Sequence, residues 1–243
     1  MSSAFLLLWL AAPLQSWGAD SRFGRRDTLD FPTKSGVLGL LCCALGAGGE
    51  QRELLAEMAL LKQTVIAYRK TVSLSDGDRR AVDQNPLLRD FQMVGSGYDE
   101  SDPWQALMIP RKSNGERAVG GGTKITYRHY LQDAVFAVVM EIPYCKAEMF
   151  AEALKNPCWD IYLGRKCCAP VDIVFRGLYD VEHNAFQNAQ TIAEDKNLVE
   201  VFRVVDGKRE GEIIVLNDVP VKFGEAKRYR ERIVTVILTE EDG

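Results

Sequence analysis

The sequence has few of the residues, and none of the short motifs, on which most catalytic and metal sites are built. Only two histidines occur among its 243 residues. Its six cysteines include no C-x-x-C pair, the spacing that zinc sites commonly use. The phosphate-binding P-loop, the H-E-x-x-H zinc motif and the G-x-S-x-G nucleophile motif are all missing. We therefore predict a protein that is not an enzyme and that needs no metal ion or cofactor.

An excess of positive charge and a long apolar run are also missing. The formal net charge is −4, whereas proteins that bind nucleic acid by themselves are usually basic. The apolar run from Phe5 to Leu14 is too short to span a bilayer and has no Lys or Arg before it, so we interpret it as a buried strand. We expect a cytoplasmic protein with reduced cysteines and no membrane contact.

The hydrophobic pattern predicts a sheet with helices, interrupted by one long polar segment. Residues 76–126 contain few apolar clusters, and a segment of this length with little regular structure is usually functional or disordered. We interpret it as an inserted arm, a long hairpin with irregular flanks. Elsewhere the pattern predicts strands at 4–10, 64–72, 133–142, 171–178, 198–205, 212–216 and 232–239, and helices that start near residue 33 and at 50–62 and 146–154.

The order of these elements indicates the fold class. Apart from the arm, the first elements follow the β-α-β-β-α-β order of a ferredoxin-like core. We predict an α+β protein with such a core at residues 1–175, with the arm inserted at about 76–126. A β-rich extension at residues 176–243 is expected to pack on the core.

Basic residues gather in predicted loops, and several of them stand beside aromatic residues. An arginine next to an aromatic ring can hold a phosphate and stack an unpaired base. A solvated surface explains any single charge cluster equally well, but the gathering of many clusters in loops around one sheet favours nucleic-acid binding through local patches. The clusters are Arg22/Arg25/Arg26, Lys34, Arg69/Lys70, Arg79/Arg80, Arg111/Lys112/Arg117, Lys124/Arg128 and Arg165/Lys166.

His129 is the one residue that suggests catalysis. A histidine near Tyr127 and Lys124 could cleave RNA without a metal ion, by general acid/base attack of a 2′-hydroxyl. No second histidine or carboxylate is tied to His129 by a motif. A surface histidine at the entrance of a strand is therefore the preferred interpretation.

Five motifs, in order along the chain, resemble those of the CasD family of the type I-E CRISPR Cascade complex. The first two and the last are specific, while the final seventy residues match poorly. The motifs are L-L-W-L-A-A-P-L-Q-S-W-G at 7–18, F-P-T-K-S-G-V-L-G-L-L at 31–41, L-R-D-F-Q at 88–92, Y-R-H-Y-L-Q-D-A at 127–134 and Y-L-G-R-K-C-C-A-P at 162–170.

The resemblance implies an RRM-like core of the RAMP superfamily with a protruding thumb, here the arm. It implies a non-catalytic subunit that holds the 5′ handle of the crRNA, caps the filament of backbone subunits, and contacts the large PAM-recognising subunit in antiviral defence. Target DNA would be reached only through the complex. The residues that we expect to bind RNA are Gln15, Trp17, Arg25, Arg26, Lys34, Ser35, Arg111, Lys112, Lys124, Arg128, Tyr162, Arg165 and Lys166.

Two alternatives remain open at this point. In related type I-C systems a protein of this family is itself the crRNA-processing endoribonuclease, and His129 supports that possibility. The negative net charge and the apolar residues of the arm fit a protein scaffold that does not touch RNA.

Overall fold

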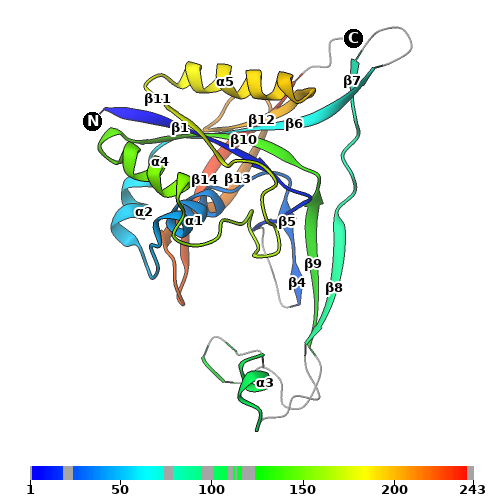
Figure 1. Cartoon of the computed structure of the whole chain (residues 1–243), viewed down its shortest axis with the longest axis vertical. Helices are drawn as coiled ribbons and strands as arrows, with labels where there is room; N and C mark the ends of the chain where they lie inside the picture. The colour runs from blue at the N-terminus through cyan, green and yellow to red at the C-terminus, as the bar shows by residue number, and fades with distance from the viewer. Residues whose placement is uncertain are drawn as a thin grey trace.

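A large antiparallel sheet organises the molecule, a computed structural model that describes residues 2–18, 24–73, 79–94, 101–108, 112, 114–116 and 124–239 (Figure 1). The expected mixture of helices and strands is confirmed. The sheet has eight strands in the order β11-β1-β10-β6-β12-β14-β13, and the short β7 pairs with β6. These strands are β1 (Ser3–Ala11), β6 (Gln63–Ser73), β7 (Arg79–Ala81), β10 (Val135–Pro143), β11 (Phe175–Tyr179), β12 (Leu198–Asp206), β13 (Glu212–Lys222) and β14 (Arg228–Leu238).

Helices cover both faces of the central strands. Figure 1 shows α5 on one side of the sheet and α1, α2 and α4 on the other. Because both faces are covered, the continuous apolar run of β1 is buried from Leu6 to Leu10, as the sequence predicts. On the α5 side, Trp9 stacks on Tyr68 with ring centroids 5.3 Å apart. The helices are α1 (Lys34–Leu45), α2 (Arg52–Met58), α4 (Ala147–Lys155, after the short 3-10 turn Tyr144–Lys146) and α5 (Glu182–Asp195).

Helix α1 begins and ends at residues suited to those positions. The Thr33 side chain accepts a hydrogen bond from the Gly36 amide, which is the usual role of an N-cap threonine. At the other end Gly46 adopts a left-handed conformation with φ of 67°, and its amide donates to the last turn of the helix. These caps set the two ends of the helix, which begins within the second sequence motif.

The C-terminal part of the chain extends the same sheet. β12 pairs with β6, and β14 and β13 follow at the edge. The three strands predicted there are present, and β13 and β14 are longer than expected. Helix α5 was not predicted. Ala185, Ala189 and Ala193 bury its inner face, and these small residues give a weak hydrophobic pattern.

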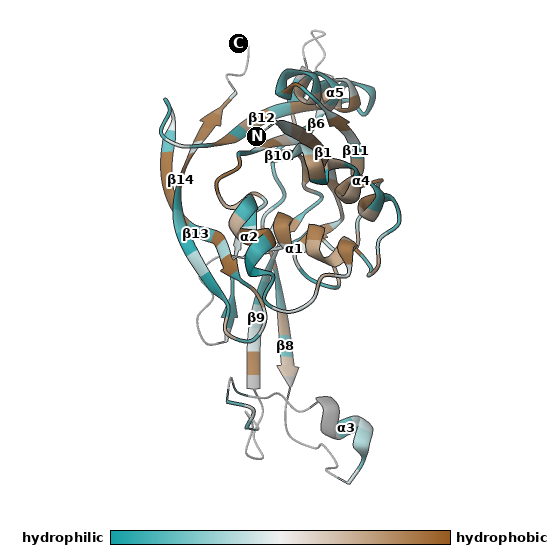
Figure 2. Ribbon diagram, turned by 90° about the vertical axis from the view of Figure 1, so that its left-hand side faces the viewer, coloured by the Kyte–Doolittle hydropathy of each residue, from teal (hydrophilic) through white to brown (hydrophobic). Residues whose placement is uncertain are grey.

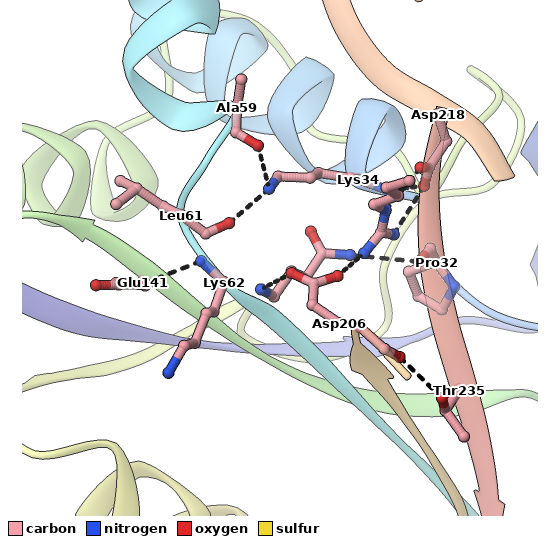
Figure 3. Close-up of polar contacts among 12 residues, drawn as sticks. Pro32, Lys34, Ala59, Leu61, Lys62, Glu141, Asp206, Asp218 and Thr235 are labelled. Atoms are coloured by element: carbon pink, nitrogen blue, oxygen red, sulfur yellow. Dashed lines mark hydrogen bonds and ion pairs between the residues drawn. The ribbon is translucent and has the colours of Figure 1, made fainter. Parts of the chain in front are cut away.

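A buried network of charges joins this extension to α1 (Figure 3). The Arg232 guanidinium donates to Asp218 from Nε (2.7 Å) and Nη2 (2.8 Å), and Nη1 donates to Asp206. Asp218 also accepts from the Lys34 backbone amide at 2.7 Å. Asp206 accepts a hydrogen bond from the backbone amide of Gln63 at 3.0 Å. The network therefore ties the start of α1 to β6, β12, β13 and β14.

A two-stranded hairpin extends away from the sheet, within the polar segment that the sequence marks (Figure 1). β8 (Leu88–Val94) pairs with β9 (Lys124–Gln132), and α3 (Pro103–Met108) lies between them in the chain. We call β8, α3 and β9 the arm and the remainder the body. β9 also pairs with the short β2 (Leu14–Gln15) and β4 (Arg25–Arg26), while β3 (Trp17–Gly18) pairs with β5 (Thr28–Leu29). In the described part of the chain, no helix is long and apolar enough to cross a membrane.

Candidate nucleic-acid interface

The first motif supplies buried side chains that brace the loop after β1. The Gln15 amide nitrogen donates to the carbonyl oxygens of Leu10 (3.1 Å) and Ala134 (2.6 Å). Its amide oxygen accepts from the Trp17 indole nitrogen at 3.1 Å. Gln15 and Trp17 are 0% and 1% exposed, so both side chains hold the loop in place from inside the protein. The RNA contacts predicted for them do not fit this burial.

Two glycines let the loop after β1 approach α1 and the 162–168 loop closely. A Cβ on Gly164, whose φ is +92°, would lie 1.7 Å from the Ser16 carbonyl oxygen. A Cβ on Gly36 would lie 2.8 Å from the Trp17 ring. No other residue fits either position without displacing backbone or ring. The first loop therefore packs directly on α1 and on the Tyr162–Cys168 loop.

Three arginines meet at the foot of the arm. β4 pairs in parallel with β9, so Arg26 lies beside Arg128 and their side chains point to the same face. Arg165, from a distant loop, donates from Nη2 to the Arg26 carbonyl oxygen (3.1 Å) and from Nε to the Ser16 hydroxyl (3.0 Å). Its guanidinium also lies 5.0 Å from the centroid of the Tyr130 ring. We call Arg26, Arg128 and Arg165 the arginine face.

The arginine face carries uncompensated positive charge. Among the described residues, none of its three members forms an ion pair with a carboxylate, although Asp90 lies opposite Arg128 in the register of β8 and β9. Lys166 follows Arg165 and is exposed. Arg165 is held in place by its two hydrogen bonds. Guanidinium groups without a carboxylate partner suit phosphate oxygens, which they can bind through two hydrogen bonds at once.

A second group of polar residues lies on the opposite face of β9. His129 Nδ1 and Asp27 Oδ1 are 3.0 Å apart, and the Arg25 Nε donates to the same oxygen at 2.8 Å. The His129 side chain is 15% exposed. The sequence does not link Asp27 to His129, because the two residues are far apart along the chain. Only the parallel pairing of β4 with β9 reveals that a carboxylate lies close to the histidine.

Comparisons with known proteins show the family of this chain. The chain matches the family described as CRISPR-associated protein (Cas_Cas5) over residues 5–236. The chain belongs to the Cas5 family. It is 32% identical over 177 residues, covering 72% of this chain and 70% of the relative, to "CRISPR system Cascade subunit CasD" of Escherichia coli (strain K12). The resemblance to the CasD family seen in the sequence motifs is confirmed.

Solved structures share the fold of this Cas5 chain. A chain from "CRISPR RNA-guided surveillance complex" aligns with a TM-score of 0.67 and 30% identity, over 97% of this chain and 90% of that one. A second structure, "Crystal structure of Cas protein", aligns with a TM-score of 0.55 and 24% identity over 96% and 94% of the two chains. The second likeness shows the fold alone.

Lys34 of this Cas5 chain requires a correction. We expected its side chain to bind phosphate, but it is 2% exposed and its ammonium donates to the carbonyl oxygens of Ala59 (3.0 Å) and Leu61 (2.5 Å). Burial lowers the pKa of Lys34 from 10.5 to about 8. The amides that open α1 are also occupied, since those of Lys34 and Gly36 donate to Asp218 and Thr33.

The remaining predicted residues fall into three places. Ser35, in the first turn of α1, and Tyr162, close to that helix, are half-buried. Lys112 is exposed in the segment between α3 and β9, where it pairs with Glu116 at 3.5 Å. Arg111 and the side chain of Lys124 lie outside the described residues. The arginine face thus collects three of the predicted residues, Arg26, Arg128 and Arg165, while Arg25 lies on the opposite face of β9 beside Asp27.

Proposed function

We propose that this Cas5 chain is a non-catalytic subunit of a Cascade-type surveillance complex, and that its arginine face holds the single-stranded 5′ handle of the crRNA. The observation that carries the proposal is the convergence of Arg26, Arg128 and Arg165 from three separate segments, without carboxylate partners among the described residues. Phosphates of a bent single strand require such clustered donors. Each charge-assisted contact of this kind contributes about 1.5–3 kcal/mol.

The body and the arm fit different parts of this role. β1, β6, β10 and β11 stand in the order β11-β1-β10-β6, and α1, α2 and α4 connect them, which supports a ferredoxin-like, RAMP core. We assign the arm as the thumb. It would pack on a backbone subunit at the end of the filament, with the large PAM-recognising subunit docked beside the body. Target DNA would be reached only through these partners, in the cytoplasm.

The test is the affinity of the full chain for RNA of its own CRISPR repeat, measured by fluorescence anisotropy across a range of salt concentrations. We expect a steep fall of affinity with salt, because each phosphate that is neutralised on a single strand adds about 0.7 to the logarithmic slope. Arg128→Ala and Arg165→Ala should each weaken binding about tenfold or more and flatten the slope. Arg209→Ala, an exposed arginine in the turn after β12, is the matched control. A slope near zero for the unchanged chain would instead favour a protein scaffold.

The pair formed by Asp27 and His129 favours one second candidate, a metal-independent endoribonuclease that cuts the crRNA precursor. A carboxylate 3.0 Å from the histidine could orient the ring as it does in acid/base sites. Incubating repeat RNA with the purified chain in the presence of EDTA decides between the two functions. Cleavage at one position that disappears in His129→Ala would establish the enzyme, and intact RNA would support the non-catalytic subunit.

A further inference from the structure

A cavity beside the arginine face has no role in the function proposed above. Its volume is about 490 Å³, within the range of about 300–1,000 Å³ usual for small-molecule sites. Helix α1 forms its floor, the 159–164 loop forms one wall, and the turn between β13 and β14 forms the other. We call it the α1 pocket. Figure 1 shows the hairpin of β13 and β14 running past α1.

The floor of the pocket contains a glycine, Gly39, with open space above it among the described residues. No heavy atom lies within 4 Å of the place where a Cβ on Gly39 would stand. Gly36, one turn earlier, is different, because Trp17 fills that space. Glycine lowers the stability of a helix relative to other residues, so Gly39 carries a cost that no contact among the described residues explains. The space above it suits a flat group that lies against the helix.

The walls provide rings and hydroxyl groups. Trp159, which is 50% exposed, and the half-buried Tyr162 line one side. Phe223 and Tyr229 line the other, with the exposed Lys227 at the turn. Burial raises the pKa of the Tyr229 phenol, which keeps that group a neutral donor and acceptor. Aromatic surfaces with a few polar groups are the usual environment of an unpaired nucleobase.

The pocket opens next to the arginine face. Ser16 and Gly164 line the pocket, and the Ser16 hydroxyl is the group that accepts from Arg165. A strand whose phosphates contact the arginines could therefore turn one nucleotide into the pocket. The far wall is held in place as well, because the Phe223 amide donates to the Glu50 carbonyl oxygen at 3.0 Å and Lys222 pairs with Glu50 at 3.1 Å.

We propose that the α1 pocket binds one extruded nucleobase of the single-stranded RNA, and that the turn between β13 and β14 is part of the RNA-binding site. This inference rests on the proposed function. It assigns a binding role to the C-terminal extension, whose sequence lies outside the five motifs. It also explains Gly39, since a side chain there would occupy the space that the base needs.

Gly39→Leu tests the inference directly, because leucine would fill the pocket while favouring the helix. The probes are repeat RNAs with a single abasic ribose at each position in turn, and affinity is read by fluorescence anisotropy on the full chain. We expect one abasic position to weaken binding to the unchanged chain on the order of tenfold. Gly39→Leu should weaken binding of the intact RNA by a similar factor, with no further loss on that abasic RNA.

The controls separate this inference from the proposed function. Ala56→Leu adds the same side chain at an exposed position of α2 and should bind every RNA normally. Tyr229→Ala should reproduce the effect of Gly39→Leu by removing a wall, which keeps the test valid if the leucine variant misfolds. Tight binding of intact RNA by both pocket variants overturns the base pocket but leaves the arginine face intact. Failure of the unchanged chain to bind any RNA overturns both proposals.

Discussion

The body buries apolar residues on both faces of its central strands, whereas the arm, beyond its foot, leaves apolar residues in contact with solvent. In the body, Leu7 and Trp9 of β1 are completely buried. In the arm, Phe91, Met93 and Ile125 are 53%, 64% and 45% exposed. Figure 2 shows apolar residues on both strands of the arm. A two-stranded hairpin has only marginal stability alone, and exposed apolar residues of this kind fit the contact with a partner subunit proposed for the arm.

The largest expected difference in stability is between substitutions of two phenylalanines, one in the body and one in the arm. Phe150, in α4, is 1% exposed, while Phe91 is 53% exposed and touches Tyr127 with ring centroids 5.6 Å apart. Phe150→Ala should lower the free energy of unfolding by about 3–5 kcal/mol, because it leaves a cavity in the core. Phe91→Ala should lower it by less than about 1 kcal/mol. Urea denaturation of the full chain measures both, and equal losses would show that the arm has a core of its own.

The next comparison uses two arginines that both pair with aspartate. The Arg232 side chain is 11% exposed and faces Asp206 and Asp218, while Arg25 at the foot of the arm is 69% exposed beside Asp27. Arg232→Met would leave two carboxylates unpaired, and we expect a loss of about 3 kcal/mol. Arg25→Met should change stability by less than about 1 kcal/mol. A small loss for Arg232→Met in the same denaturation assay would mean that the extension does not depend on the buried network.

Alkaline pH should reveal a smaller effect that belongs to the body alone. The pKa of Lys34 falls from 10.5 to about 8 on folding because burial penalises the charged form. Between pH 8 and 10.5 the unfolded chain holds the proton that the folded chain has lost, so stability rises with pH in this window. Relative to Lys34→Met, the unchanged chain should gain up to about 3 kcal/mol from pH 8 to pH 10.5.

The stability of the unchanged chain must be compared with that of Lys34→Met at each pH, because Cys42 changes stability with pH in the opposite direction. Burial raises the pKa of Cys42 to about 11, so its contribution to stability falls as pH rises through the same range. Both proteins contain Cys42, and its effect cancels in the comparison. A constant difference between the two stability curves would show that Lys34 keeps an ordinary pKa in the folded chain.

The sequence predicts an element best where burial on both faces requires an unbroken run of apolar residues. The apolar run of β1 must be covered on both faces, and the buried strand that the run predicts is present. The inserted arm stays a prediction. Helix α5 was missed because its buried face consists of alanines, which look neutral in a hydrophobic pattern. Its position depends on the close approach of the helix to β1 and β10, which no local pattern encodes.

The candidate site was predicted in part, for a related reason. Charge and motif marked Arg26, Arg128 and Arg165, and the structure brings them together. The same criteria selected Gln15 and Lys34, whose polar groups satisfy the backbone inside the protein. Polarity in a motif does not distinguish a group that holds the site in shape from one that meets a ligand. Only the hydrogen-bond partners separate the two.

The arm leaves and rejoins the body at neighbouring strands. β6 leads into it and β10 follows it, and Tyr68 and Val135, near its two ends, are direct partners in that antiparallel pair. The sheet therefore sets where the arm starts, independently of how many residues the arm contains. Each residue added to both strands would move the tip outward by about 3.3 Å and turn the next side chains to the opposite face. In this way proteins with one body could present the tip of the hairpin at different distances from the sheet by changing only the length of the hairpin.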